Sequence, residues 1–293
     1  MDGIVNVNKP LGITSHDVVY RLRRILGIKK IGHTGTLDPD ASGVLPMCVG
    51  KGTKLAEYLT AKDKQYFATM KLGSFTDTQD ASGKIIESFE VSVTKEEIRD
   101  AVKGFVGDIM QIPPMYSAIK VDGKKLYELA REGKTVEREP RQVTIENIEI
   151  KNIDMETNTV EMLVDCSKGT YIRTLCNDIG AALGCGGHMA SLKRTKSGRF
   201  DIKDSFTLEE IEKMAGENDF SFMVSVGEAL SEYEKIVLAD RNAQRVRNGI
   251  KISVEGLKMD EIYRVFDEQE EFLALAQQTE NGFTIIKSFY GGA

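Results

Sequence analysis

The sequence predicts a protein of two domains, in which strands and helices are mixed and the last part is rich in strands. Its length of 293 residues suits two domains at roughly 150 residues each. Its 41% hydrophobic and 29% charged residues are typical of folded globular chains. After about residue 235 the pattern changes to short apolar runs, near 250–254, 261–267, 271–276 and 283–289. These runs predict a small β-rich module at the end of the chain.

The composition argues against several other kinds of protein. No apolar stretch approaches the roughly 18 to 20 residues of a membrane span. The first residues, MDGIVNVNKP, lack the pattern of a secretory signal. The four cysteines form no C-x-x-C pair and no short disulfide framework. We therefore expect a cytoplasmic protein from a reducing compartment.

The N-terminal part of the chain predicts alternating strands and helices. Ser15 is expected to cap a helix that ends at Gly27, since apolar residues recur at helical spacing between them. Thr94 and Glu97 form a capping box for another helix, which is expected to end near Gly104. The other expected elements are a strand over 3–8, a long glycine- and proline-containing loop over 31–50, a short helix near 53–60, and strands over 64–73 and 84–91.

The middle of the chain predicts an exposed insertion and further elements of both kinds. Residues 120–141 mix lysine, arginine and glutamate, which indicates an exposed helix and loop. Thr207 and Glu210 form a second capping box. The remaining expected elements are paired strands over 142–150 and 158–166, a helix over 172–183 with Gly184 at its end, and helices over 207–214 and 240–249.

Charge is unevenly distributed along the chain. The formal net charge is −6, which by itself disfavours a nucleic-acid partner, because phosphates require local positive charge. Residues 1–60, however, contain eight Lys and Arg against five Asp and Glu, and a second basic cluster spans 193–199. Both a basic binding face and ordinary solvated helix faces therefore remain open.

Asp38 is the strongest candidate for chemistry. Pro39 favours an extended backbone at Asp38, and the surrounding glycines allow another molecule to approach closely. An Asp-Pro pair in such a stretch is most often a turn. The alternative is a carboxylate held on a rigid loop as a nucleophile or base. His33, five residues earlier, is more often structural than catalytic in such a setting.

Arg173 and Tyr66 are further candidates. Arg173 is expected in the first turn of a helix, where a cation opposes the helix dipole. It could instead hold a carboxylate in a bidentate pair and keep that carboxylate ionised. Tyr66, on an expected strand, could stack on a base, although a strand tyrosine is more often packing.

Other site types lack their patterns. The stretch GHTGTLDPDASG matches neither phosphate-binding motif that glycine-rich loops form before helices. No G-x-S-x-G elbow is present. A zinc site of Cys176, Cys185 and His188 matches no common spacing. The residues alone therefore indicate that the acidic loop around Asp38 is a candidate functional site, and they do not identify a reaction.

Several segments, in order along the chain, resemble motifs of the TruB family of tRNA pseudouridine synthases. The most specific is 32–39 with 41–45, which resembles the family's catalytic motif. Thr36 and Ser42 are mild variants of small residues within it. The resemblance covers roughly residues 3–200. Its other segments are Asn8-Lys9-Pro10, Lys64-Gln65-Tyr66 with 73–78, Pro113–Ala118, Cys166–Arg173 and, more weakly, 187–194.

The resemblance implies the architecture of the chain. It implies an α+β pseudouridine-synthase fold, with a mixed, largely antiparallel central sheet, over residues 1–235. Residues 120–141 would be an insertion that grips the T arm of tRNA. Residues 236–293 would be a small PUA-like RNA-binding domain.

The resemblance also implies a reaction and its residues. Uridine 55 in the T loop of tRNA is flipped out and isomerised to pseudouridine, with Asp38 as nucleophile or base, Arg173 as its ion-pair partner, and Tyr66 stacked on the base. His33 would hold the opened loop, and Tyr171 and Leu192 would line the pocket. The expected phosphate contacts are Lys9, Arg21, Arg24 and Lys193.

This reaction needs no cofactor and no metal, so none is expected. The expected partner is the tRNA T stem-loop, bound by a monomer without a membrane or an obligatory protein partner. Two alternatives remain open: a non-catalytic protein that binds or folds tRNA on the same scaffold, and a protein component of a guide-RNA machine.

Overall fold

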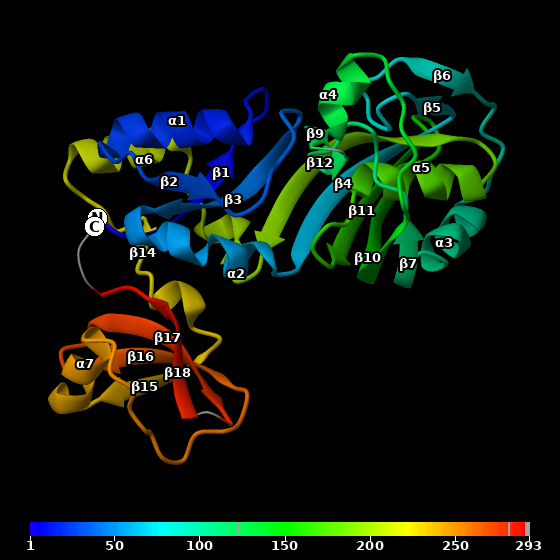
Figure 1. The fold of residues 1–293 in the computed structure, drawn as a ribbon. Coiled ribbons are helices and arrows are strands. Elements are labelled where there is room, and N and C mark those ends of the chain that lie inside the picture. The colour runs from blue at the N-terminus through cyan, green and yellow to red at the C-terminus, as the bar shows by residue number, and fades with distance from the viewer. Residues whose placement is uncertain (122, 281, 291–293) are drawn as a thin grey trace.

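A computed structural model describes residues 1–121, 123–280 and 282–290 of the chain. It contains one long sheet, helices that pack on it, and a second, smaller sheet at the C-terminal end (Figure 1). The described residues include no helix that is both long and apolar enough to cross a membrane.

The long sheet has ten strands and runs in the order β14-β1-β3-β12-β4-β11-β10-β7, with β2 beside β3 and β13 beside β12. Among its described pairs, only β12 with β3 is parallel; the others are antiparallel. The mixed, largely antiparallel sheet that the resemblance implied is therefore confirmed. Its strands are β1 (Gly3–Lys9), β2 (Ile31–His33), β3 (Ala41–Val49), β4 (Lys64–Leu72), β7 (Gly107–Gln111), β10 (Arg141–Asp154), β11 (Thr159–Cys166), β12 (Gly187–Ser197), β13 (Phe200–Asp201) and β14 (Met223–Val224).

Helices cover the two halves of this sheet separately. One apolar cluster joins α1 (Ser15–Leu26) and α6 (Leu208–Gly216) to β1 and β3. Another joins α3 (Lys95–Lys103) and α5 (Ile172–Ala182) to β4, β10, β11 and β12. The capping boxes expected at Thr94 and Thr207 are both present. Each core therefore fixes one half of the sheet, and the halves meet where β12 lies between β3 and β4.

Short elements fill the connections. Residues 120–141, called the insertion below, contain a two-stranded hairpin and a helix, which agrees with the exposed helix and loop expected there. The short elements are β5 (Ser74–Thr76), β6 (Ile85–Ser88), β8 (Lys120–Val121), β9 (Lys124–Lys125), α2 (Ala56–Thr60), α4 (Leu126–Arg131), and the 3₁₀ turns η1 (Gly50–Leu55), η2 (Ile202–Asp204) and η3 (Glu228–Leu230).

The first helix is capped one residue earlier than expected. Thr14, and not Ser15, is the N-cap, and its capping box partner is Asp17. Ser15 is buried, and its hydroxyl contacts the backbone of Leu37. The expected end of the helix is confirmed, because Gly27 has the left-handed conformation. Both residues favour helix starts, and the tertiary contact of Ser15 decides between them.

The long loop expected over 31–50 was wrong for most of its length. Residues Ile31–His33 and Ala41–Val49 are strands, and only 34–40 is a loop. Residues 41–49 have almost no solvent exposure, so they lack the alternation that marks a half-buried strand. The strand β12 was not recognised either. It begins at Gly187, and four basic residues interrupt the apolar pattern by which a strand is recognised. These are His188, Lys193, Arg194 and Lys196.

The C-terminal sheet is built from β15 (Glu234–Leu238), β16 (Ile262–Asp267), β17 (Phe272–Thr279) and β18 (Gly282–Ser288), with α7 (Asp240–Arg247) beside it. The β-rich character of this region is confirmed. Residues 250–254 are not a strand, because Ile252 makes only an isolated bridge to Phe283. Leu275 of β17 and Phe289, directly after β18, share an apolar cluster with Val44 of the long sheet. The two sheets are therefore packed together.

Candidate active site

The candidate site lies at the middle of the long sheet, where segments far apart in the sequence meet. Asp38 lies in the loop between β2 and β3, Tyr66 on β4, and Arg173 in the first turn of α5. The loop that follows β5 supplies a fourth residue, the charged Asp80. Figure 1 shows α1 and α4 on the same side of the sheet, with the loop between β2 and β3 between them.

Hydrogen bonds from the N-terminal segment hold the loop of Asp38. The Ser15 hydroxyl accepts from the amide of Leu37 at 2.8 Å and donates to its carbonyl at 3.0 Å. The amide of Gly12 donates to the carbonyl of Pro39 at 2.9 Å. Asp38 therefore sits on a braced loop with restricted backbone freedom.

Lys9 contributes to the same bracing, and its expected role as a phosphate contact is wrong. Its side chain is fully buried. Its ammonium donates to the carbonyls of Pro10 at 2.9 Å, Ile13 at 2.8 Å and Pro39 at 3.3 Å. Burial lowers the pKa of Lys9 to about 8, while Asp38 and its neighbours oppose that change. All three donors of the ammonium are used inside the protein, so none is left for a phosphate.

Arg173 joins two carboxylates and two backbone carbonyls. Its side chain is 7% exposed. One terminal nitrogen lies 3.2 Å from a carboxylate oxygen of Asp38 and 2.8 Å from the carbonyl oxygen of Tyr116. The other lies 3.3 Å from Asp80 and also donates to the carbonyl of Thr78 at 3.4 Å. The planar guanidinium fork can serve several acceptors in this way.

The environment of Asp38 acts on its protonation in two directions. Burial raises the pKa of Asp38 above its usual value, and the nearby Asp80 adds to that rise. The Arg173 guanidinium opposes both effects. The Asp38 side chain is nevertheless 43% exposed. Asp38 is thus accessible to a ligand and sits beside a cation that favours its ionised form.

Asp80 was missed at the level of sequence. Its other carboxylate oxygen accepts from the hydroxyl of Thr78 at 2.7 Å and from the amide and hydroxyl of Ser82. The tetrapeptide DASG occurs at both 40–43 and 80–83, and this signal reads as turn chemistry. Residues 81–83 do form a turn, but Ala41–Gly43 begin β3, and only the aspartate of the second copy, Asp80, pairs with Arg173. Nothing local reveals a contact that spans 93 positions in the chain.

Tyr66 lies beside a buried arginine. It is directly opposite Arg194 in the pairing of β4 with β12. Arg194 is 2% exposed, and its Nε donates to the carbonyl of Val44 at 2.7 Å. Burial raises the pKa of Tyr66, and Arg194 opposes that rise. The phenol is therefore neutral at physiological pH, with a cation next to it.

Three other expected residues surround this centre. His33 is half-buried at the end of β2, and burial lowers its pKa, so the neutral ring is favoured. Tyr171 precedes α5, and its backbone is held on both sides by the Gln111 amide, at 2.9 and 3.1 Å. Leu192 is half-buried on β12, where it packs against both apolar clusters of the sheet.

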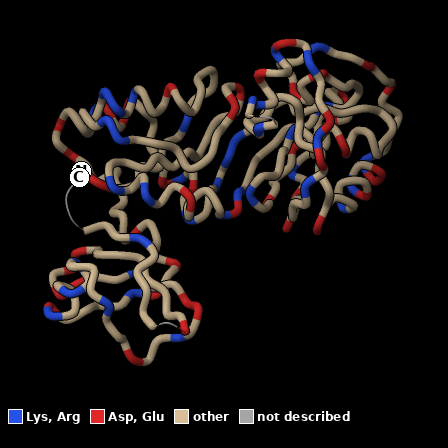
Figure 2. Tube along the Cα trace, in the orientation of Figure 1, with Lys and Arg blue, Asp and Glu red and all other residues tan. Residues whose placement is uncertain are grey.

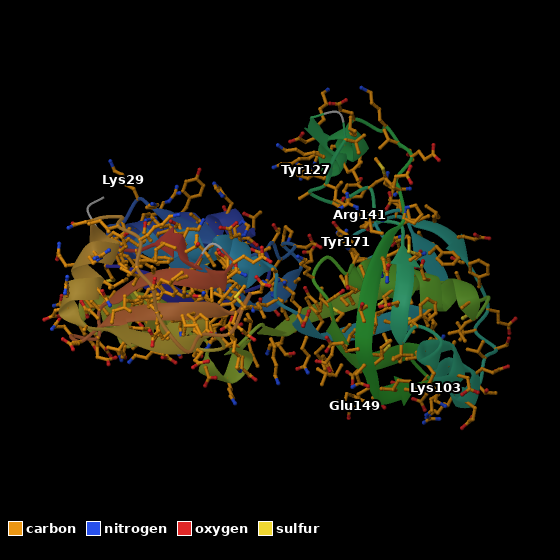
Figure 3. The ribbon with its side chains drawn as sticks, turned by 60° about the horizontal axis from the view of Figure 1, so that its bottom comes forward. Lys29, Lys103, Tyr127, Arg141, Glu149 and Tyr171 are labelled. Carbon is orange, nitrogen blue, oxygen red and sulfur yellow. The ribbon has the colours of Figure 1, made fainter. Side chains whose placement is uncertain are left out.

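Tyr171 also lies near the insertion. Figure 3 shows it close to Arg141, below the part of the insertion that carries Tyr127, while Lys103 lies away from this group. Burial raises the pKa of Tyr171, and Ser117 and the cations Arg173 and Arg141 oppose that rise. The insertion therefore stands next to the candidate site.

The remaining cations expected at the site are on the surface. Arg21, Arg24 and Lys193 are exposed, and Arg21 also lies 3.9 Å from the exposed Glu209. Lys and Arg gather where β4 and β12 cross the middle of the long sheet (Figure 2). Arg24 and Lys193 are therefore accessible to an anion from solvent, and Arg21 is accessible beside Glu209.

A cavity of about 260 Å³ opens beside the ion pairs of Arg173. Asp40, Asp80 and Ser82 line it together with residues 189–191 of β12. In the described part of the chain, no group of three His, Cys, Asp or Glu side chains is arranged to hold a metal ion. The chemistry available here is therefore that of a carboxylate, a phenol and guanidinium groups beside an open hollow.

Comparison with protein families identifies the chain. Residues 23–172 match the family model described as TruB family pseudouridylate synthase, N-terminal domain. The chain belongs to the TruB family of pseudouridylate synthases. Residues 173–233 match a second model, the tRNA pseudouridylate synthase B C-terminal domain. As a member of this family the protein is an isomerase.

Relatives of this TruB family member match over nearly their whole length. The tRNA pseudouridine synthase B of Clostridium novyi is 48% identical over 291 residues, which are 98% of this chain and 99% of that protein. The tRNA pseudouridine synthase B of Clostridium tetani is 46% identical over 292 residues, with 98% and 99% covered.

Solved structures show the same fold. A structure of an H/ACA RNP bound to a substrate RNA containing 2′-deoxyuridine has a TM-score of 0.75 and 26% identity, covering 99% of this chain and 85% of that one. A Cbf5-Nop10-Gar1 complex has a TM-score of 0.74 and 28% identity, covering 99% and 84%. The pseudouridine-synthase fold expected from the sequence is confirmed.

Proposed function

We propose that this protein converts uridine 55 in the T loop of tRNA to pseudouridine, with Asp38 as the catalytic nucleophile or base. The single observation that carries the proposal is the accessible Asp38 carboxylate, held 3.2 Å from the buried Arg173 guanidinium in a TruB family chain. The full-length similarity to proteins named tRNA pseudouridine synthase B supports the choice of tRNA.

The reaction sets clear demands on the side chains. The bond between C1′ of the ribose and N1 of uracil breaks, the base turns, C1′ bonds to C5, and the proton on C5 leaves. An ionised Asp38 can attack C1′, attack C6, or remove a ribose proton. All three routes need the carboxylate as its anion, and Arg173 supplies the charge that favours the anion.

Tyr66 has two roles in the proposal. Its ring stacks on the target base, and its hydroxyl takes part in removing the proton from C5 at the end of the reaction. The cationic neighbour Arg194 stabilises negative charge on the phenol oxygen and so supports the second role. Leu192 and Tyr171 complete the walls of the pocket.

The RNA must open before the reaction. The target uridine lies inside a folded loop, so it is flipped out at a cost of a few kcal/mol. His33 is neutral and half-buried at the rim, which suits stacking in the opened loop. Arg21, Arg24 and Lys193 are the proposed phosphate contacts.

In this proposal the two domains bind different parts of the tRNA. Residues 1–235 form the catalytic domain, in which 120–141 grip the T arm, and residues 236–293 form a PUA-like RNA-binding domain. A cavity of about 310 Å³ in the second domain is lined by Arg245 and Lys251 together with Asn242 and Ser253. These cations and polar groups suit RNA phosphates.

The decisive experiment uses the lone chain. The purified protein is incubated with an unmodified tRNA transcript, which is digested to nucleosides and mapped for pseudouridine by position. We expect pseudouridine at position 55 without added protein or cofactor, from a monomer that works in the cytoplasm. A transcript in which uridine 55 is replaced by cytidine is the matched control.

Two other functions predict different results. A non-catalytic tRNA-binding protein would bind the transcript and leave every uridine unchanged. A component of a guide-RNA machine is suggested by the likeness to the H/ACA RNP structure, and it would act only with added guide RNA and proteins. Pseudouridine at a position other than 55 would support the proposed enzyme activity and overturn the proposed target uridine.

A further inference from the structure

The exposed side of α1 carries an aromatic pair without a structural role in the described chain. His16 and Tyr20, one helical turn apart, contact each other edge to face, with ring centroids 4.7 Å apart. Tyr20 is 55% exposed and His16 is exposed. The core of this helix is made by Val18, Val19 and Leu22 on the buried side. The pair therefore contributes little to the core.

This pair is continuous with the candidate site. The next residue after the helix cap, Ser15, is bonded to Leu37 in the loop of Asp38. His16 follows Ser15 directly, in the first turn of α1. Leu11, in the turn that braces the same loop, is 63% exposed. Apolar and aromatic surface therefore extends from the rim of the site along α1.

The charges around the pair are mainly positive. The guanidinium of Arg23 lies 5.8 Å from the centre of the Tyr20 ring, and Arg24 is exposed one turn beyond Tyr20. The acid nearest in sequence, Asp17, is engaged by the backbone and hydroxyl of Thr14 as part of the cap. Stacking surfaces flanked by cations are typical of sites for unpaired nucleotides.

We propose that His16 and Tyr20 form a stacking platform for an unpaired nucleotide next to the flipped uridine. The inference rests on the proposed function, because it requires RNA with its target loop over Asp38. The RNA would then be held on two sides of the site, by the insertion on one side and by α1 on the other (Figure 1). Ring stacking tolerates any base, so this platform adds affinity and register more than sequence selectivity.

The first test compares variants on an RNA hairpin with the T-arm sequence at one salt concentration. Tyr20→Ala is expected to raise the Kd about fivefold to tenfold, at the low end of stacking energies because the ring is half-exposed. The rate constant at saturating RNA is expected to stay within about twofold, because the ring does not touch the reacting atoms. Tyr20→Phe keeps the stacking surface and is expected to match the wild type.

Met110→Ala is the matched control, since Met110 is a large side chain that is 62% exposed on the edge strand β7. It is expected to leave the Kd unchanged. A Tyr20→Ala variant that binds like the Met110 control would overturn the platform.

The second test identifies the nucleotide that stacks. Each unpaired position of the hairpin loop is replaced in turn by an abasic residue. At one position the wild type is expected to lose about fivefold in affinity, while Tyr20→Ala loses nothing more, since the same contact is already gone. If no position shows this coupling, the inference fails.

The third test uses fluorescence. The chain contains no tryptophan, so Tyr20→Trp introduces a single reporter. Its emission is expected to fall on addition of the hairpin, with the same midpoint as binding, whereas Met110→Trp is expected not to respond. Equal responses from both would contradict stacking at α1.

These results separate the two proposals. If the wild type modifies tRNA and the α1 variants behave like the control, only the platform is wrong. If the wild type neither binds nor modifies tRNA, the proposed function and the platform are both wrong.

Discussion

Replacing Arg173 tests whether the site depends on the shape of a guanidinium or only on its charge. Arg173→Lys keeps the charge but replaces a planar fork by a single ammonium. The arginine reaches Asp38 and Asp80 with different terminal nitrogens, at 3.2 and 3.3 Å. One ammonium is expected to lose at least one of these partners.

The magnitude follows from one lost charge-assisted hydrogen bond, which is worth about 1.5–3 kcal/mol. Solvent reaches Asp38, whose side chain is 43% exposed, so we take the low end of this range. A loss of about 1.5–2 kcal/mol corresponds to a rate roughly 10 to 30 times slower. Arg99→Lys is the matched control, because Arg99 pairs with Glu96 on the exposed side of α3.

The pH dependence separates charge from geometry. The proposed mechanism needs ionised Asp38, so activity is expected to fall as the pH drops through the pKa of that carboxyl. Burial raises this pKa and Arg173 lowers it. Arg173→Met removes the lowering, so the acid limb of kcat/KM is expected to move to higher pH, and part of the activity returns at still higher pH. Arg173→Lys is expected to leave the acid limb almost in place.

The assay is single-turnover release of tritium from RNA labelled at C5 of the target uridine, since the C5 hydrogen is replaced when the new bond forms. The rate is followed over a range of pH with enzyme in excess. A lysine variant at the wild-type rate would refute the geometric reasoning. A methionine variant with an unmoved acid limb would refute the electrostatic reasoning.

Three further substitutions test the site and its scaffold. Asp38→Asn is expected to abolish turnover and to keep tRNA affinity within about tenfold, or ~1.4 kcal/mol; nucleoside analysis and filter binding check this, and measurable turnover would remove Asp38 from its role. Tyr66→Phe is expected to keep stacking and slow any step that needs the hydroxyl, so a wild-type rate of tritium release would restrict Tyr66 to stacking. Gly43→Ala is expected to cost about 1–3 kcal/mol of folding stability, because φ is +103° and the new Cβ would lie 2.2 Å from the carbonyl oxygen of Arg194; an unchanged melting temperature would show that the two strands separate easily.

Local signals predicted many element boundaries well. The capping boxes at Thr94 and Thr207 are present because side chain and backbone partners lie three residues apart. The helix over 172–183 and the strand pair formed by β10 and β11 were also found, since their apolar residues recur at the period of the element. Such features depend on neighbours in the chain.

Elements buried at the centre of the sheet were harder to predict. The sequence predicts a loop where β3 lies, because β3 is buried along almost its whole length and contains Gly43 and Pro46. β12 was missed because Arg194 and Lys196 interrupt its apolar pattern. Arg194 is nevertheless buried, since Val44 provides a carbonyl acceptor for it. Burial on both faces, or of a charge, removes the alternation on which a strand prediction depends.

The amino-acid sequence by itself determined the family motif around Asp38, the capped helices and the β-rich C-terminal end. These features are local, so each can be predicted from a single stretch of residues. Only the tertiary structure decided that Lys9 is buried with its ammonium on three backbone carbonyls, and that Asp80 joins Asp38 at Arg173. The physical reason is that burial and ion pairing between distant segments depend on where the sheet brings those segments together.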